Sequence, residues 1–254
     1  VESMKHAFAD RAKHMADPQF AHVPVSDLLD PTYLDELSSR VQPDRTLPGS
    51  VYGGVCPPPD DSGTSHLSVV DSEGVVVVCT ETINTSFGSF VLVPKFDFAL
   101  NNEMDDFTTV AGQTNVYGLR QSDRNMPEPG KRPISSMSPT IVLRDGKPVL
   151  AIGASGGPRI ITAVAQVVMD ILWRHDDPVD AVSRPRLHHQ WVPDAVVVEE
   201  DWDDAEMTAA LESRGHDVTR RTHVGVVQVI EITPDGKMRP ASDPRKGGRP
   251  AGID

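Results

Sequence analysis

Thr64 is the residue with the clearest chemical potential in this sequence of 254 residues. It follows Gly63, at the point where a polar, proline-rich passage ends and a β-branched, apolar passage begins. If the Gly63–Thr64 bond were cut, Thr64 would carry both a hydroxyl nucleophile and a free α-amino group. An α-amino group has a pKa of roughly 7.7–8.0, so near neutral pH it can serve as a general base for the hydroxyl. On this stretch alone, however, a Gly–Thr pair that simply opens a strand is the favoured interpretation.

Two further stretches carry groups suited to binding a reacting molecule. Gly156 and Gly157 come just before a predicted helix that begins at Arg159. Bare backbone N–H groups at a helix N-terminus can hold a developing oxyanion, although close packing of a strand on the helix also explains the two glycines. The run 101–106 groups amides and carboxylates, and on its own it is most simply a solvated loop. Each stretch therefore leaves a functional and a structural interpretation open.

Composition argues against several classes of function. The formal net charge is −13, with acidic residues spread along the chain, which argues against nucleic acid or an anionic membrane surface as partner. No apolar run approaches the ~20 residues of a transmembrane helix. Cys56 and Cys79 are too few for a disulfide scaffold. His188 and His189 do not predict a metal site, because neighbours in a strand point to opposite faces and no third ligand has suitable spacing. No cofactor is predicted.

The elements around Thr64 are predicted from residue alternation and turn chemistry. Residues 67–70 and 75–80 are largely β-branched and apolar, and an acidic turn that ends in Gly74 joins them. This pattern is typical of a β-hairpin, with Thr64 at the mouth of its first strand. Three elements are predicted to follow: a polar loop at 84–90, a short strand at 96–100 and a long loop, typical of a lid, at 108–132.

The rest of the pattern alternates hairpin strands with helices. A helix from Arg159 to about Trp173 carries apolar residues on nearly every face and should be buried between layers. Near the N-terminus we expect a helix over residues 1–16 and a second helix capped by Asp30. In the first helix, one face carries Met4, Ala7, Phe8 and Ala12, and in the second, Leu34 and Leu37 form the predicted buried side. The other predicted elements are strands at 141–144, 149–153 and 196–198, helices at 178–184 and 204–214, and a hairpin over 226–238. Pattern alone predicts an antiparallel α+β chain with helices covering sheets.

A series of motifs runs in order from Gly63 nearly to the C-terminus. It comprises residues 63–71 (GTSHLSVVD), 82–84 (TIN), 101–107 (NNEMDDF), 115–119 (NVYGL), 131–140 (KRPISSMSPT), 156–161 (GGPRII), 185–191 (PRLHHQW) and 241–245 (ASDPR). This series resembles the small subunit of γ-glutamyltranspeptidases, and an ordered series is far more specific than any single motif. The resemblance implies the N-terminal nucleophile hydrolase fold, an αββα sandwich of two mainly antiparallel sheets between helical layers.

The resemblance also implies roles for individual residues. The precursor would cut itself between Gly63 and Thr64, and Thr64 would then attack γ-glutamyl amides such as glutathione, forming a γ-glutamyl-threonine intermediate. Thr82 matches the residue whose hydroxyl steadies the nucleophile. The other matches are Gly156 and Gly157 for the oxyanion, Asn84, Glu103 and Asp106 for the substrate's α-amino group, Ser135 and Ser136 for its α-carboxylate, and Tyr117 in the lid.

The resemblance divides the chain at Thr64. Residues 64–254 match the catalytic small subunit, and residues 1–63 match only the C-terminal tail of the large subunit. In that tail, residues 42–62 are rich in Pro, Gly, Asp and Ser and are expected to be extended or mobile. Family members bind the α-carboxylate with an arginine of the large subunit that this tail does not include. The rest of that subunit is therefore an expected partner, beside the γ-glutamyl donor and an amino acid or water as acceptor. By analogy with relatives we expect a periplasmic or extracellular location.

Two other interpretations remain open. A related acylase, acting on cephalosporin side chains or poly-γ-glutamate, would use the same nucleophile. The intact segment 115–119 favours the transpeptidase, because acylase relatives often shorten it. The second alternative is an unprocessed precursor fragment that acts only by binding, and the intact mass distinguishes it, since a cut chain gives two species.

Overall fold

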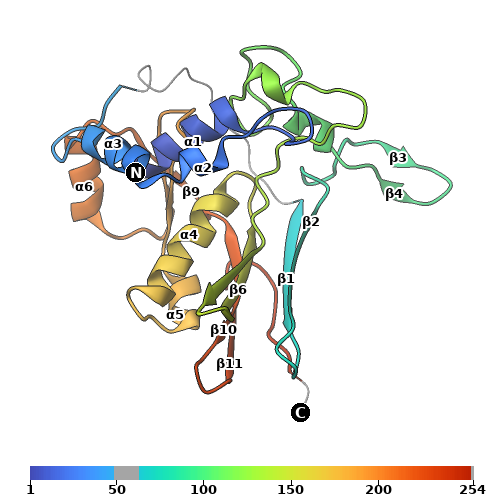
Figure 1. The fold of residues 1–254 in the computed structure, drawn as a ribbon, viewed down its shortest axis with the longest axis vertical. Coiled ribbons are helices and arrows are strands. Elements are labelled where there is room, and N and C mark those ends of the chain that lie inside the picture. The colour runs from blue at the N-terminus through green and yellow to red at the C-terminus, as the bar shows by residue number, and fades with distance from the viewer. Residues whose placement is uncertain (49–62, 253–254) are drawn as a thin grey trace.

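A four-stranded antiparallel sheet forms the centre of the computed structural model, which describes residues 1–48 and 63–252 (Figure 1). Its strand order is β11-β10-β6-β5. The strands are β5 (Thr140–Arg144), β6 (Lys147–Ser155), β10 (Val226–Ile232) and β11 (Met238–Ser242). Both hairpin turns place a glycine, Gly146 and Gly236, at a positive φ that glycine adopts at little steric cost. The predicted hairpins over 141–153 and 226–238 are confirmed.

Two helices, α4 (Arg159–Leu172) and α5 (Pro178–Ser183), cover one face of this sheet and bury the main core (Figure 1). The buried core residues of the sheet and α4 include Leu150, Ile152, Ala154, Ile160, Ala163, Val167, Val227 and Val229. The prediction that this helix is buried between layers is wrong for one of its sides. Met169 and Trp173 are 37% and 75% exposed, because the sheet covers only the side of α4 that faces it.

The predicted hairpin that begins at Thr64 is confirmed as β1 (Thr64–Val70) and β2 (Val76–Thr82). It packs against β6 and β10, on the sheet face away from α4. His66 points into this interface and lies so close to the sheet that a Cβ added at Gly153 would be 2.2 Å from its Cε1 atom. The layers are therefore helix, sheet and hairpin, with the start of β1 beside the last part of β6.

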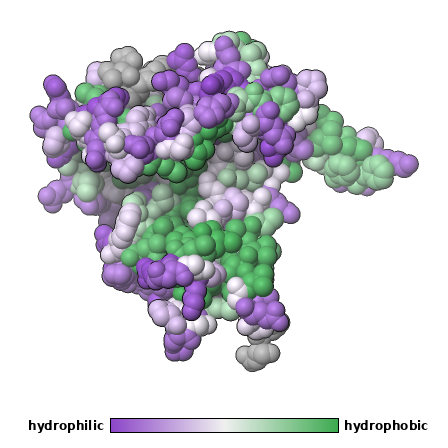
Figure 2. Space-filling view, in the orientation of Figure 1, coloured by the Kyte–Doolittle hydropathy of each residue, from purple (hydrophilic) through white to green (hydrophobic). Residues whose placement is uncertain are grey.

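The outer face of the hairpin is apolar and exposed. Leu67 and Val77 are 63% and 54% exposed, and Leu143 on the neighbouring edge strand β5 is 59% exposed. Figure 2 shows apolar residues gathered over the hairpin and this sheet edge. Of the predicted helix–sheet–sheet–helix order, the described residues supply one helical layer and both sheets.

A smaller sheet of three strands lies apart from the central one. It contains β7 (Leu187–His188), β8 (Val196–Glu199) and β9 (Val218–Arg221), with α6 (Ala205–Ser213) between the last two. The predicted strand at 196–198 and helix at 204–214 are confirmed, and Asp204 caps α6 by accepting the Met207 N–H. The pair β8–β9 is parallel. Strand β9 does not follow from the sequence pattern, because Val-Thr-Arg-Arg carries no apolar alternation.

The segment between the hairpin and β5 is mostly loop, as predicted. It contains a short ribbon, β3 (Leu92–Val93) and β4 (Phe98–Ala99), which projects from the body (Figure 1). Two single 3-10 turns, Glu103–Asp106 and Asp123–Asn125, interrupt the rest.

Three N-terminal helices lie across the end of the sheets: α1 (Glu2–His14), α2 (Val25–Leu28) and α3 (Pro31–Arg40). Asp30 caps α3 as predicted. The predicted burial of Leu34 is wrong, because this side chain is 47% exposed, and Ala7 on the apolar face of α1 is also exposed. Helix α1 instead buries Lys5 and Arg11 beside Phe8 and Ala12, since both charged side chains find polar partners in distant segments. Most of the predicted linker, residues 49–62, lies outside the described residues.

Candidate active site

Two paired threonines at the open end of the β1–β2 hairpin form the centre of the site. The hydroxyl oxygens of Thr64 and Thr82 are 2.9 Å apart, and the two residues are direct partners in the ladder. The Thr82 hydroxyl accepts the Asn84 N–H at 2.8 Å and donates to the Gly63 carbonyl at 3.2 Å. Because a hydroxyl has one hydrogen, Thr64 is then the donor to Thr82. The predicted proximity of the two threonines is confirmed.

The Gly63 carbonyl oxygen accepts two hydrogen bonds. Besides the Thr82 hydroxyl, the Ile83 N–H donates to it at 3.1 Å. The space at Gly63 is tight, since an added Cβ would lie 2.4 Å from the Thr85 carbonyl oxygen. Only glycine therefore fits immediately before Thr64, and its carbonyl is already polarised by two donors.

Lys246 reaches the nucleophile candidate from the far end of the chain. Its Nζ donates to the main-chain carbonyl of Thr64 at 2.7 Å. The sequence predicts this contact only weakly, through the position of Lys246 directly after the motif 241–245.

A buried charge network holds the segment that carries Lys246. Arg186 donates to Asp243 at 2.7 Å, and Arg245 donates to both Asp243 and Glu199. Both carboxylates are essentially inaccessible to solvent, so the paired guanidinium groups compensate for their burial. The network fixes the chain just before Lys246.

The acidic turn Glu103–Asp106 lies next to the threonine pair. Asn102 N–H donates to the Ile83 carbonyl at 3.0 Å, and the Asn84 side chain donates back to the Asn102 carbonyl at 2.9 Å. Asn84 itself is buried. These bonds attach the turn to the end of β2, so the acidic run is not the solvated loop that its composition alone suggests.

Both predicted amine-binding carboxylates of this turn are shifted toward neutrality. Burial, followed by the nearby Glu103, raises the pKa of Asp106 to about 7, while the charge of Arg11 opposes this shift. Burial also raises the pKa of Glu103. Glu103 Oε1 is buried and has no hydrogen-bond partner within residues 1–48 and 63–252. Asp106 Oδ1 accepts from Asn115 at 3.1 Å. An ammonium group would satisfy both carboxylates.

Tyr117, the predicted lid residue, is buried over Asn84. Its hydroxyl donates to the Asn84 carbonyl at 2.7 Å, and it is only 3% exposed. Gln190 holds the lid from the other side by donating to the Tyr117 carbonyl at 2.8 Å. The segment 115–119 is therefore closed onto the predicted amine site.

The predicted carboxylate-binding serines lie in the extended segment before β5. Ser135 is exposed, and its hydroxyl accepts the Met137 N–H at 3.1 Å. Ser136 is half-buried, and its hydroxyl accepts from Arg11 at 3.2 Å. Arg11 lies on α1, and an arginine on a predicted apolar helix face is the only signal for it in the sequence.

Gly156 and Gly157 connect β6 to α4 at φ values of 135° and 55°. A Cβ at Gly156 would lie 2.8 Å from the Cα of Gly225, so the close-packing explanation holds for this glycine. The position of His66 on Gly153 brings the start of β1 toward this end of β6. The oxyanion role of Gly156 and Gly157 remains a prediction.

His188 is a core residue. Its ring nitrogens contact Thr162 and Gln190 at 2.8 and 3.0 Å, and burial lowers its pKa to about 3. In the described part of the chain no group of three or more His, Cys, Asp or Glu side chains is arranged to hold a metal. Nor does any helix there have the length and apolar content needed to cross a membrane.

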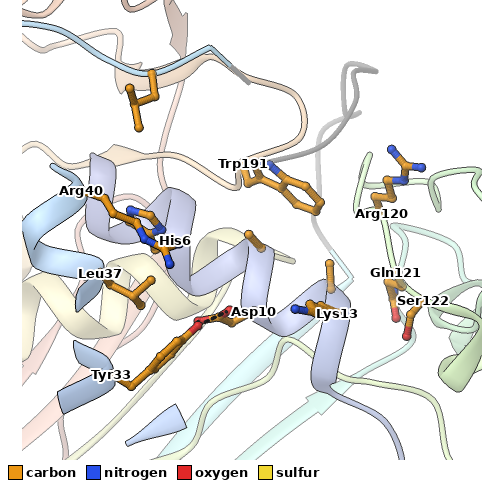
Figure 3. A pocket seen from close by; sticks show the side chains of 13 residues that line it. His6, Asp10, Lys13, Tyr33, Leu37, Arg40, Arg120, Gln121, Ser122 and Trp191 are labelled. Atoms are coloured by element: carbon orange, nitrogen blue, oxygen red, sulfur yellow. Dashed lines mark hydrogen bonds between the residues drawn. The ribbon is translucent and has the colours of Figure 1, made fainter. Parts of the chain in front are cut away.

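A separate cavity of about 420 Å³ lies between α1, α3 and the loop at 120–122 (Figure 3). Trp191 and the hydrogen-bonded pair Asp10 and Tyr33, 2.9 Å apart, are among its lining residues. None of the predicted site residues lines this cavity.

Comparisons with known proteins identify the family of the chain. A family model described as Gamma-glutamyltranspeptidase matches residues 1–253. The chain is 40% identical over 246 residues to the glutathione hydrolase proenzyme of Escherichia coli strain K12. The aligned region covers 96% of this chain and 42% of that protein. The chain thus spans under half the length of this curated relative.

Solved structures give the same result for the fold. A γ-glutamyltranspeptidase from Pseudomonas nitroreducens is 38% identical with a TM-score of 0.71, covering 74% of this chain and 99% of that chain. A cephalosporin acylase from Bacillus halodurans has a TM-score of 0.80 at 23% identity, covering 100% of this chain and 44% of that chain. The second similarity concerns the fold alone.

Proposed function

The chain belongs to the γ-glutamyltranspeptidase family and has the N-terminal nucleophile hydrolase fold, and on this premise we propose that Thr64 is its nucleophile. The proposed activity is hydrolysis and transfer of the γ-glutamyl group of glutathione and related amides, after the chain is cut at Gly63–Thr64. The observation that carries the proposal is the Thr82 hydroxyl, which contacts both the Thr64 hydroxyl and the Gly63 carbonyl.

The geometry of the uncut chain supports self-cleavage. Thr64 Oγ attacks the Gly63 carbonyl carbon, and the C–N bond breaks as the nitrogen takes up the hydroxyl proton and becomes the α-amine of Thr64. Water then hydrolyses the ester, leaving a carboxylate on Gly63 and restoring the hydroxyl. Negative charge develops on the Gly63 oxygen during the attack, and the Thr82 and Ile83 donors are already directed at that atom.

The freed amine then serves the second reaction. It accepts the hydroxyl proton as Thr64 Oγ attacks the γ-carbonyl carbon, and the departing amine of the donor takes that proton. The resulting γ-glutamyl ester reacts with water to give glutamate, or with the amine of an amino acid to give a new γ-glutamyl amide. Gly156 and Gly157 are the proposed oxyanion donors for both steps.

The proposed donor site has opposite polarities at its two ends. Glu103 and Asp106 face the α-ammonium group, together with Asn84, while Ser135 and Ser136 receive the α-carboxylate. Support comes from the unsatisfied Glu103 Oε1 and from the bonds that tie the acidic turn to β2. Tyr117 closes over this end of the site.

Residues 1–63 and 64–254 are the proposed large-subunit tail and catalytic small subunit. The remainder of the large subunit is the proposed partner, and the exposed apolar outer face of the hairpin supports this, because such a face requires a covering layer. A periplasmic or extracellular location is proposed by analogy with relatives.

A test should use the full-length precursor. For the wild type we expect two species in the intact mass spectrum and hydrolysis of a γ-glutamyl anilide. Thr64→Ala should give a single uncut species and no turnover, because it lacks the attacking oxygen. Thr64→Ser, which keeps the hydroxyl, is the matched control and should be cut. Equal turnover by the wild type and Thr64→Ala would reject Thr64 as nucleophile.

The acylase alternative has weaker support. The acylase similarity is 23% identical, against 40% for the E. coli glutathione hydrolase, and the lid segment 115–119 is intact and docked. Turnover of a cephalosporin side-chain amide in preference to the γ-glutamyl anilide would favour it. A single uncut wild-type species without turnover would favour the non-catalytic fragment.

A further inference from the structure

Arg11 is a buried cation of the N-terminal helix α1. Its side chain lies on α1 and is 9% exposed, and no ion pair within 4.0 Å involves it among the residues that the structure describes. Its one side-chain hydrogen bond there goes from Nη2 to the Ser136 hydroxyl at 3.2 Å. Burial lowers its pKa to about 10, so it stays charged near neutral pH. A buried charge is costly unless something compensates for it.

The surroundings of Arg11 indicate which kind of group compensates for it. Ser136 is one of the residues proposed to receive the donor's α-carboxylate, and the charge of Arg11 also acts through space on Asp106, proposed to hold the α-ammonium group. Arg11 therefore interacts with a residue at each end of the proposed donor site. An amino-acid zwitterion carries one ammonium group and one carboxylate group, one for each end of this site.

We propose that Arg11 is a positioning residue for the γ-glutamyl donor, which sets the Ser136 hydroxyl as a donor to the substrate carboxylate and supplies positive charge near Asp106. The inference rests on the proposed function of the site. It assigns a binding role within this chain to a residue of the N-terminal segment that precedes the cut.

The effect on Ser136 follows from the direction of the hydrogen bond. A guanidinium group can only donate, so the Ser136 oxygen is the acceptor in its bond with Arg11. The hydroxyl hydrogen of Ser136 is then free to be donated to an anionic ligand. Positive charge from Arg11 behind that hydroxyl strengthens its bond to a carboxylate.

The effect on Asp106 follows from the charges around it. Glu103 and Asp105 of the same turn disfavour its ionised form, and Asn115 of the lid segment donates to it. Arg11 is the cation that opposes these two carboxylates. Without it, the pKa of Asp106 would be higher, and a larger fraction of the carboxylate would be protonated at neutral pH. A protonated Asp106 attracts an ammonium group less strongly.

The experiment is a pH series on the processed full-length enzyme with a γ-glutamyl anilide as donor. The variants are Arg11→Met, Arg11→Lys and, as a matched control on the same helix, Lys13→Met, whose side chain is exposed. For Arg11→Met we expect the donor KM at pH 7.5 to rise roughly tenfold or more, because the site loses a charged contact. The ratio of the Arg11→Met KM to the wild-type KM should decrease toward pH 9, because Asp106 becomes ionised in both proteins. We expect kcat to change little.

The controls separate positioning from packing. Arg11→Lys keeps the charge and should follow the wild-type pH dependence, and Lys13→Met should match the wild type throughout. An unchanged KM in Arg11→Met, or a KM ratio that does not vary with pH, overturns the proposal. The proposal is also overturned if Arg11→Met and Arg11→Gln both fail to fold while Arg11→Lys has wild-type kinetics. The charge of Arg11 would then serve folding alone. Turnover by Thr64→Ala would instead reject the proposed function, so the two failures are distinguishable.

Discussion

Asp106 is a carboxylate whose charge changes close to neutral pH. Its burial and the neighbouring Glu103 raise its pKa to about 7, well above the value of an exposed aspartate. An ammonium group binds to the ionised form, so the proposed donor affinity increases as the pH rises through about 7 and decreases below it. The substrate ammonium itself loses its proton only at higher pH.

We therefore expect kcat/KM for the donor to depend on two ionisations, Asp106 and the Thr64 α-amine, both of which must be deprotonated. In Asp106→Asn one of them is absent, so the acidic limb of the pH profile should become less steep. The value at pH 8 should also decrease by roughly ten- to a hundredfold, since a charged contact is lost. Initial rates from pH 5.5 to 9.5 measure both effects. Equal slopes for the wild type and Asp106→Asn would contradict this assignment.

Among the elements, the β1–β2 hairpin combines a regular ladder with a tight junction at its open end. Thr64 and Thr82 are opposed because the register is continuous from there to Val70 and Val76. At the junction, Gly63 approaches the Thr85 carbonyl so closely that an added Cβ would be 2.4 Å away. The same hairpin has a second glycine, Gly74, at φ 83° in its turn, where a Cβ would meet nothing within 4 Å.

These two glycines allow a matched comparison. Gly63→Ala must displace the backbone at the cleavage point at a cost of about 1–3 kcal/mol, and we expect cleavage to slow by roughly ten- to a hundredfold. Gly74→Ala should lower the free energy of unfolding by about 1–2 kcal/mol through its left-handed φ, yet be cut at the wild-type rate. A time course of intact mass measures the cleavage rate, and a chemical denaturation curve measures the free energy of unfolding. Wild-type cleavage of Gly63→Ala would show that the fit at this position is unimportant.

Across the whole molecule, the C-terminal segment returns to the first residue of β1. Lys246 donates to the Thr64 carbonyl, and the buried network of Arg186, Asp243, Arg245 and Glu199 fixes the chain that carries it. The two contacting residues are 182 positions apart, so this contact joins the start of β1 to the C-terminal segment.

We expect Lys246→Met to slow both cleavage and turnover roughly fivefold, because one hydrogen bond worth about 1 kcal/mol at a part-exposed site no longer holds the nucleophile strand. Lys246→Arg should recover part of the rate. Lys237→Met is the control, since Lys237 pairs with Asp235 on an exposed turn remote from the nucleophile. The assignment is wrong if the Lys246 and Lys237 variants behave alike.

What the sequence predicts well depends on local pattern. Residue alternation and a turn glycine identify the hairpin, and the side chain of Asp30 identifies the start of α3. The motif order points to Thr64 and Thr82 together, and their contact is found. Strand β9 and the burial of Lys5 and Arg11 are not predictable in this way. Their stability comes from partners far along the chain, such as Asp194 for Lys5 and Ser136 for Arg11.

The Thr82 hydroxyl has a further consequence for maturation. In the uncut chain its single hydrogen points at the Gly63 oxygen, so it can only receive a hydrogen from Thr64. Once Gly63 departs with the severed end, that hydrogen is released and the Thr64 oxygen is the nearest acceptor. Severing the chain would thus reverse the polarity of the threonine–threonine bond, so that the first reaction prepares the oxygen for every later one.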